Sequence, residues 1–144
     1  GSKAMQCVLQ SEDSSLLLDE CQGPGQIWSS VGQPGSGLTF PIAYADSYNL
    51  GSFGGKCVTY NEQTDLNLTI GLECSSESVP RFIYTQNKRL VVQGGDKVGW
   101  CVWADQGTHP KLKVCPGPGM VWSGPGQPGS GSTFSIAYAD SYNK

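Results

Sequence analysis

The sequence has few charged residues and little that could support catalysis or metal binding. Asp, Glu, Lys and Arg make up 15% of its 144 residues, against a usual ~25%. Lysine and arginine form no cluster and the formal net charge is −3, so we expect no nucleic-acid partner. One histidine, His109, and no C-x-x-C motif argue against a zinc site, and we expect no metal or other cofactor. No Gly-x-Ser-x-Gly or Cys/His nucleophile pattern occurs, so we expect no enzymatic activity.

Two kinds of long segment are also missing. No window sustains a capped 3.6-residue hydrophobic period, so we expect almost no helix. No apolar run is long enough to predict a membrane span. Residues 1–5 are typical of a cloning remnant, and we expect that a secretory leader has been removed. The 20 glycines, about twice the usual frequency, suit a turn-rich β protein.

Cysteine, in contrast, is present in a regular pattern. Cys7 and Cys21 are fourteen positions apart and Trp28 follows them, and the same arrangement returns 94 residues later. A looser copy lies between the two, which describes a threefold repeat. The repeat selects one pairing out of the possible ones and predicts three disulfides, Cys7–Cys21, Cys57–Cys74 and Cys101–Cys115. Disulfides require an oxidising compartment, and we therefore expect a secreted, extracellular protein.

The first and last copies have not diverged evenly. Residues 7–31 match their counterparts at 9 of 25 positions, whereas residues 32–49 match residues 126–143 at 16 of 18. Either backbone geometry or a functional surface is expected to hold the second segment fixed, with gene conversion as a third explanation.

Short strands and tight turns fill each copy. Alternating or apolar runs predict strands at residues 16–18, 39–44, 66–70, 89–92 and 111–114. The Pro-Gly steps favour type II turns, because proline fixes φ and glycine accepts a positive φ; they lie at residues 24–25, 34–35, 118–119 and 128–129.

Three such units favour a β-trefoil, and several short motifs agree. Gln26-Ile27-Trp28 matches a Q-x-W signature, and Gln6-Cys7-Val8, Lys56-Cys57-Val58 and Trp100-Cys101-Val102 look like a G-K-C-L repeat start. With these motifs the chain resembles the ricin B-type (R-type) lectins over residues 6–144. The resemblance implies one all-β domain, a pseudo-threefold β-trefoil with repeats at about 6–55, 56–99 and 100–144. We expect Trp28, Phe82 and Trp122 to fill its core, and residues 132–138 to pair with residues 6–9.

The ligand residues of that family are not carried over. Its usual galactose site has an Asp two residues after the first cysteine, where this chain has Leu9, Thr59 and Trp103. The family often has an aromatic residue two positions before the second cysteine, where this chain has Asp19, Leu72 and Lys113. The chain therefore either binds no simple galactose or binds it through other residues.

The duplicated segment offers an alternative binding site. Aromatic, carboxylate and amide side chains are the groups that recognise sugars, through C–H contacts and hydrogen bonds to hydroxyls. The candidate residues are Tyr44, Asp46, Tyr48 and Asn49, which recur as Tyr138, Asp140, Tyr142 and Asn143. The competing structural interpretation is that Asp closes an Asx turn while the tyrosines cover the barrel. Trp103, near Asp105 and His109, is a further candidate sugar platform.

These observations favour a secreted carbohydrate-binding protein, either a lectin or a carbohydrate-binding module. Its expected partner is a glycan or polysaccharide, bound in the first and third copies and not in the middle one. The alternative is a β-trefoil protein-interaction module, such as a protease inhibitor or secreted effector, because one fold hosts both roles. The sequence does not determine the sugar or the oligomeric state.

Overall fold

The computed structural model describes residues 6–11, 14–30, 39–104, 109–124 and 133–140. Within them the protein is all-β, as predicted, and helix is confined to the four-residue α1 (Leu50–Phe53) and the 3-10 turn η1 (Glu62–Thr64). The strands are β1 (Gln6–Gln10), β2 (Leu16–Glu20), β3 (Trp28–Ser30), β4 (Ile42–Tyr44), β5 (Lys56–Asn61), β6 (Asn67–Glu73), β7 (Phe82–Tyr84), β8 (Leu90–Val92), β9 (Trp100–Trp103), β10 (Lys111–Val114), β11 (Trp122–Ser123), β12 (Thr133–Phe134) and β13 (Ala137–Tyr138).

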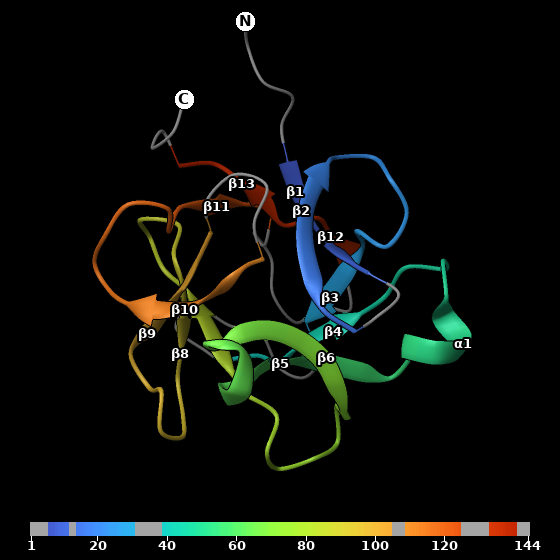
Figure 1. Ribbon diagram of the computed structural model, residues 1–144, viewed down its shortest axis with the longest axis horizontal. Helices are drawn as coiled ribbons and strands as arrows, with labels where there is room; N and C mark the ends of the chain where they lie inside the picture. The colour runs from blue at the N-terminus through green and yellow to red at the C-terminus, as the bar shows by residue number, and fades with distance from the viewer. Residues whose placement is uncertain (1–5, 12–13, 31–38, 105–108, 125–132, 141–144) are drawn as a thin grey trace, which may run out of the picture.

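The strands form two sheets that curl around a shared interior (Figure 1). One has the order β11-β13-β1-β2, and the other the order β12-β3-β4-β5-β6-β10-β9-β8-β7. The expected pairing of the two ends is confirmed for residues 136–137, since Cys7 lies opposite Ala137 and the Val8 amide donates to the Ile136 carbonyl at 2.8 Å. The first part of the predicted segment differs, because β12 pairs with β3 and not with β1, and residue 132 lies outside the described residues. In the four-stranded sheet, β1 from the start of the chain is therefore paired with β13 from the end of the described residues.

Three hairpins, β1–β2, β5–β6 and β9–β10, carry one disulfide each. The bonds are Cys7–Cys21, Cys57–Cys74 and Cys101–Cys115, which confirms the pairing predicted from the repeat. Each disulfide joins the first strand of a hairpin to the chain at or just beyond the end of its second strand. In the chain-entropy account, closing a loop of this size stabilises the fold by roughly 3 kcal/mol.

Two of the predicted turns can be checked. Gly25 has φ 77° and Gly119 has φ 83°, the left-handed values that a type II turn needs at its third residue. The steps at 34–35 and 128–129 lie outside the described residues. The strand predicted at 39–44 is shortened: Phe40 forms an isolated bridge with Phe82, and β4 begins only at Ile42, after the proline. Proline cannot donate to a ladder, so it interrupts the pairing.

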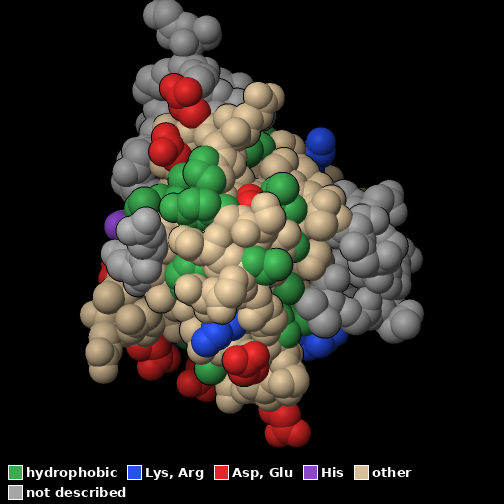
Figure 2. Space-filling model, turned by 90° about the vertical axis from the view of Figure 1, so that its right-hand side faces the viewer, with side chains coloured by type: hydrophobic (Ala, Val, Ile, Leu, Met, Phe, Trp, Pro, Cys, Tyr) green, Lys and Arg blue, Asp and Glu red, His purple; other side chains and the backbone are tan. Residues whose placement is uncertain are grey.

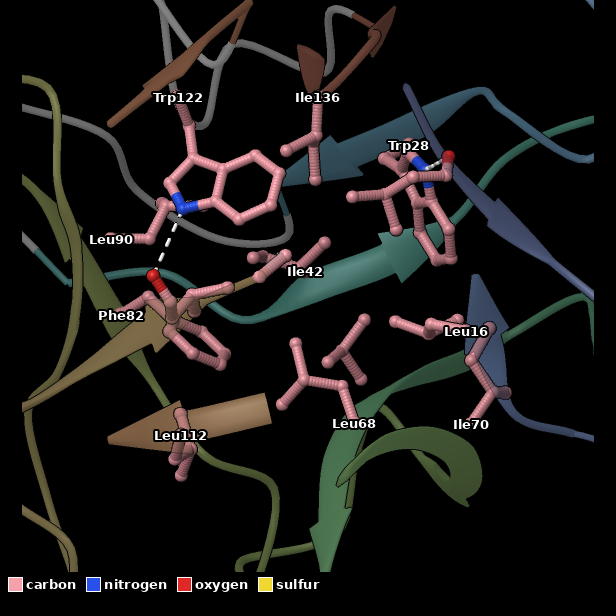
Figure 3. Packing of buried hydrophobic residues seen from close by; sticks show 14 of the residues in the cluster. Leu16, Trp28, Ile42, Leu68, Ile70, Phe82, Leu90, Leu112, Trp122 and Ile136 are labelled. Atoms are coloured by element: carbon pink, nitrogen blue, oxygen red, sulfur yellow. Dashed lines mark hydrogen bonds between the residues drawn. The ribbon is translucent and has the colours of Figure 1, made fainter. Parts of the chain in front are cut away.

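Three aromatic side chains fill the interior, as predicted. Trp28, Phe82 and Trp122 are each 0% exposed (Figure 3). The Trp28 Nε1–H donates to the Val8 carbonyl at 3.1 Å, and the Trp122 Nε1–H donates to the Val102 carbonyl at 3.0 Å. A buried indole N–H needs an acceptor, and here the first strand of a disulfide hairpin supplies it.

Replacing Trp28 with Phe tests this contact. We expect the Trp28→Phe variant to lose about 2–4 kcal/mol of unfolding free energy, because it leaves a small cavity and a buried carbonyl without its donor. Urea denaturation at unchanged m-value measures the loss. The neighbouring Ile27 is 42% exposed, so Ile27→Ala is the matched control and should change stability by less than about 0.5 kcal/mol. A loss below about 1 kcal/mol for the Trp28 variant would show that the hydrogen bond is not a core contact.

Candidate functional site

The two tyrosines that begin the duplicated polar segment pack against the core tryptophans. Tyr44 meets Trp28 edge-on, with ring centroids 5.5 Å apart and planes at 81°. Tyr138 meets Trp122 in the same way, at 5.4 Å and 78°. Both tyrosines are buried, so neither ring offers a face to a ligand. This geometry is preferred for aromatic pairs and contributes about 0.5–1.5 kcal/mol beyond area burial.

The two aspartates of the segment bond to the backbone ahead of the same tryptophans. Asp46 is buried, and its Oδ2 accepts from the Gln26 amide at 2.9 Å. Asp140 Oδ2 accepts from the amides of Gly119 and Met120 at 2.8 and 2.9 Å. Gln26 and Met120 both stand two residues before a core tryptophan. The carboxylates thus hold the backbone that leads into β3 and β11, the strands that carry the two tryptophans.

The second oxygen of Asp46 has a local role. Asp46 Oδ1 accepts from the Tyr48 amide at 3.0 Å, which forms the Asx turn of the structural interpretation. The Tyr44 hydroxyl donates to the Tyr48 carbonyl. Burial, and then the charges of Asp46 and Tyr48, raise the pKa of Tyr44 to about 12, so its hydroxyl stays protonated and able to donate. Tyr44, Asp46, Tyr138 and Asp140, predicted as sugar ligands, have internal contacts instead, and we leave them out of the candidate site.

Of the other predicted residues, some are exposed or half-buried and some lie outside the described residues. Tyr48 is 40% exposed. Asn49 is exposed, has φ 55° and precedes α1 without a side-chain cap bond. Trp103 is half-buried on β9, with the Lys113 ammonium 4.1 Å from its ring centroid. Tyr142, Asn143 and Asp105 lie outside the described residues, and the Nδ1 of His109 faces the Leu16 carbonyl at 2.9 Å.

Tyr48 lines an open pocket with a volume of about 480 Å³ beside the first hairpin. Exposed Asp19, Glu20 and Gln22 supply two carboxylates and an amide to its wall. The buried Gln26 forms part of the lining, but its side chain is occupied, donating to the Glu20 carbonyl at 2.7 Å and accepting from the Gly23 amide at 3.2 Å. The exposed polar side chains around this pocket are therefore those of Tyr48, Asp19, Glu20 and Gln22.

A similar open pocket, of about 490 Å³, lies beside the second hairpin. It is lined by residues 59–63 together with Thr69, Leu72 and Ser78. Thr59 and Leu72 occupy the same offsets from their cysteines as Leu9 and Asp19, so the two pockets sit at matching places. The sequence predicts no site in the middle copy, because residues 85–96 contain no counterpart of the Tyr/Asp segment. The repeat offsets around each cysteine were the signal that could have found this pocket.

In comparisons with protein-family models, curated proteins and solved structures, nothing matches this chain. Within the described residues no helix is long and apolar enough to cross a membrane. The same part of the chain contains no group of three or more His, Cys, Asp or Glu residues that could hold a metal ion.

Removing the Asp46 carboxylate should destabilise the protein. We expect Asp46→Ala to reduce the unfolding free energy by about 1.5–3 kcal/mol, because two backbone amides lose a charged acceptor. Denaturant titration measures the loss. Asp19→Ala is the control, since Asp19 is exposed and bonds only the adjacent Glu20 amide, at 2.8 Å, in the described structure. Equal stability of the two variants would contradict the internal role of Asp46.

The buried Tyr44 hydroxyl predicts a pH dependence at the alkaline end. Its pKa is about 12 in the folded protein and 10.0 in the reference state. Between these values the unfolded chain releases the proton while the folded chain keeps it, so unfolding free energy falls as pH rises. We expect Tyr44→Phe to make this alkaline fall shallower, although the variant is less stable near neutral pH. Urea melts of both proteins from about pH 9 to about pH 12, a range that includes the ordinary phenol pKa and reaches the folded value, would show it, and parallel curves would contradict it.

Proposed function

We propose that this protein is a secreted carbohydrate-binding protein without catalytic activity, and that its principal site is the pocket beside the first hairpin. The supporting observation is the exposed Tyr48 ring beside the carboxylates of Asp19 and Glu20 and the amide of Gln22. An aromatic face packs against sugar C–H groups, and carboxylates and amides accept and donate hydrogen bonds to hydroxyls. The described residues thus combine the required groups at one accessible place.

The internal contacts of the duplicated segment support the same site. Asp46 and Tyr44 hold the backbone of Tyr48 at its amide and carbonyl, respectively. A ligand-binding ring fixed before binding loses less conformational entropy on complex formation. In this proposal Tyr44 and Asp46 are positioning residues, and Tyr48 is the contact residue. By repetition of the sequence, Tyr142 would be the corresponding contact residue in the third copy, and Asn49 and Asn143 remain proposed polar contacts.

We further propose that the curled sheets form a β-trefoil related to the R-type lectins. The support is the repeated unit: a disulfide hairpin, then a strand with a buried aromatic residue, in three successive copies. The two pockets also lie at the cysteine offsets that the resemblance implies for ligand residues. Tyr60, Glu62 and Gln63 give the middle pocket similar chemistry, so it is proposed as a second, weaker site. Two or more sites on one domain would raise the apparent affinity for a branched or polymeric glycan.

Tyr48→Ala is the direct test. On a glycan array, the wild-type protein should bind a defined group of glycans. By titration calorimetry, Tyr48→Ala should weaken binding of the best glycan by roughly 10- to 100-fold, equivalent to about 1.4–2.7 kcal/mol. Its melting temperature should stay near that of the wild type, because the exposed ring is not core. Tyr60→Ala is the corresponding change in the middle pocket. Comparing its loss of glycan affinity with that of Tyr48→Ala shows how much each pocket contributes to binding.

One surface feature favours the alternative of a protein-interaction module. The α1 side of the molecule carries exposed hydrophobic side chains (Figure 2), and Ile27, Tyr48 and Leu50 are all at least 40% exposed. A glycan array that shows no binding to plant, fungal or animal glycans would contradict carbohydrate binding and support this alternative. A protease-inhibition panel would then be the appropriate measurement.

A further inference from the structure

The outer face of the β9–β10 hairpin joins an aromatic ring to two cations. Lys111 lies directly opposite Trp103 in the ladder, and Lys113 lies opposite Cys101, so both lysines share the face of Trp103. Their ammonium groups are 6.0 and 4.1 Å from the Trp103 ring centroid. This face lies outside the two pockets described above.

The ring is held in place from its edge. Gly119, with φ 83°, lies against the indole, and a Cβ at this position would come within 2.7 Å of Trp103 Nε1 and of the Ala104 carbonyl. The Ala104 amide donates to the Gly119 carbonyl at 3.0 Å, which anchors the chain beside the ring. A glycine is therefore needed for the indole to pack here, and the half-buried ring is a preformed platform.

The charge on this face is only partly neutralised by the described residues. Lys111 pairs with Asp65 at 3.1 Å. Asp140 lies behind the platform and accepts from the Gly119 amide. Lys113 is exposed and has no carboxylate partner within the described part of the chain. Its ammonium is the group available to an incoming anion.

The matching faces of the other hairpins lack this chemistry. In the first hairpin the corresponding residues are Leu9, Leu17 and Asp19; in the second they are Thr59, Thr69 and Leu72. Neither set contains a cation or an aromatic ring. The combination of ring and cations is therefore specific to the third copy and is not required by the shared hairpin geometry.

We propose that the Trp103–Lys111–Lys113 face binds the anionic units of an acidic saccharide, that is, a sugar carrying a carboxylate or a sulfate. This inference rests on the proposed carbohydrate binding and extends it to a second site with a defined ligand class. The anionic group pairs with the Lys113 ammonium, which lies over the indole 4.1 Å from its centroid, and the C–H groups of the sugar ring pack on the part of the indole that this ammonium leaves uncovered. Lys111, held by Asp65, adds positive potential.

Binding of three oligosaccharides tests the proposal. Trigalacturonate presents carboxylates, a heparin tetrasaccharide presents sulfates as well, and fully methyl-esterified trigalacturonate is the neutral control. We expect at least one of the anionic probes to bind at low salt, to bind several-fold more weakly at about 0.15 M salt, and to outcompete the neutral probe. Which of the two binds better distinguishes carboxylate from sulfate recognition. Because the chain has four tryptophans, the signal of Trp103 is obtained as the difference in emission between the wild type and a Trp103→Phe variant.

Variants separate this face from the first pocket. Lys113→Gln should weaken binding of the anionic probe by about three- to fivefold, as expected for the loss of one exposed ion pair. Lys97→Gln is the matched control, because the Lys97 ammonium also lies over a tryptophan, 4.6 Å from the Trp100 centroid, and it should leave binding unchanged. Tyr48→Ala should also leave it unchanged, so failure of the first pocket and failure of this face can be told apart.

Three results with the saccharide probes and the lysine variants would overturn the proposal. They are equal binding of the neutral and anionic probes, no effect of Lys113→Gln, and equal effects of Lys113→Gln and Lys97→Gln. Lys113 is exposed, so its variant is expected to fold, and circular dichroism checks that it does. Binding of inorganic sulfate as tight as that of the anionic saccharide would likewise overturn the saccharide assignment, because it would show that the sugar ring contributes nothing.

Discussion

The hydrogen bond from a buried indole to a hairpin carbonyl is the contact around which the rest of the structure is arranged. Trp28 and Trp122 each place a large apolar ring and one polar N–H in the interior, and that N–H cannot be left without an acceptor. Val8 and Val102 provide the acceptors. Each bond fixes a tryptophan strand against the first strand of a disulfide hairpin. The disulfide restrains that hairpin, so ring, strand and crosslink support one another. Phe82 fills the corresponding place in the middle copy without an N–H, and that copy is also the one lacking the Tyr/Asp segment.

This arrangement gives a structural reason for the identity of the Tyr and Asp residues that the first and third copies share. Tyr44 and Tyr138 pack on the tryptophan rings, and Asp46 and Asp140 hold the backbone just ahead of them. The residues that look most like a sugar site are thus partly framework. Framework and surface are nevertheless linked, because the oxygen of Asp46 that does not reach Gln26 fixes Tyr48, whose ring is exposed. One short segment therefore stabilises the core and orients a surface aromatic residue.

The three hairpins share a backbone plan but differ in the charge of their outer faces. The first pocket has acidic side chains in its wall, the second has Tyr60 and Glu62, and the third hairpin has Trp103 with two lysines. Side chains that point outward from a strand pair contribute little to the core, so they can change without loss of the fold. In the proposed function, a repeated framework with different outer faces would allow one domain to contact several kinds of sugar unit along one glycan chain.

The sequence alone determined the features that depend on local spacing and residue type. The cysteine pairs, the short strands of the hairpins and the burial of Trp28, Phe82 and Trp122 follow from a pattern repeated three times, because the same local geometry must satisfy each copy. The Pro-Gly turns at residues 24–25 and 118–119 follow from the first and third copies alone. Whether Asp46 and Tyr44 face solvent or the interior was decided only by the tertiary structure, since their partners Gln26 and Trp28 are brought to them by strand pairing. The middle pocket and the cationic face around Trp103 depend in the same way on the ladder register. That register determines which side chains from separate strands become neighbours. The register itself is set by the pairing of whole strands and not by the charge or shape of any single residue.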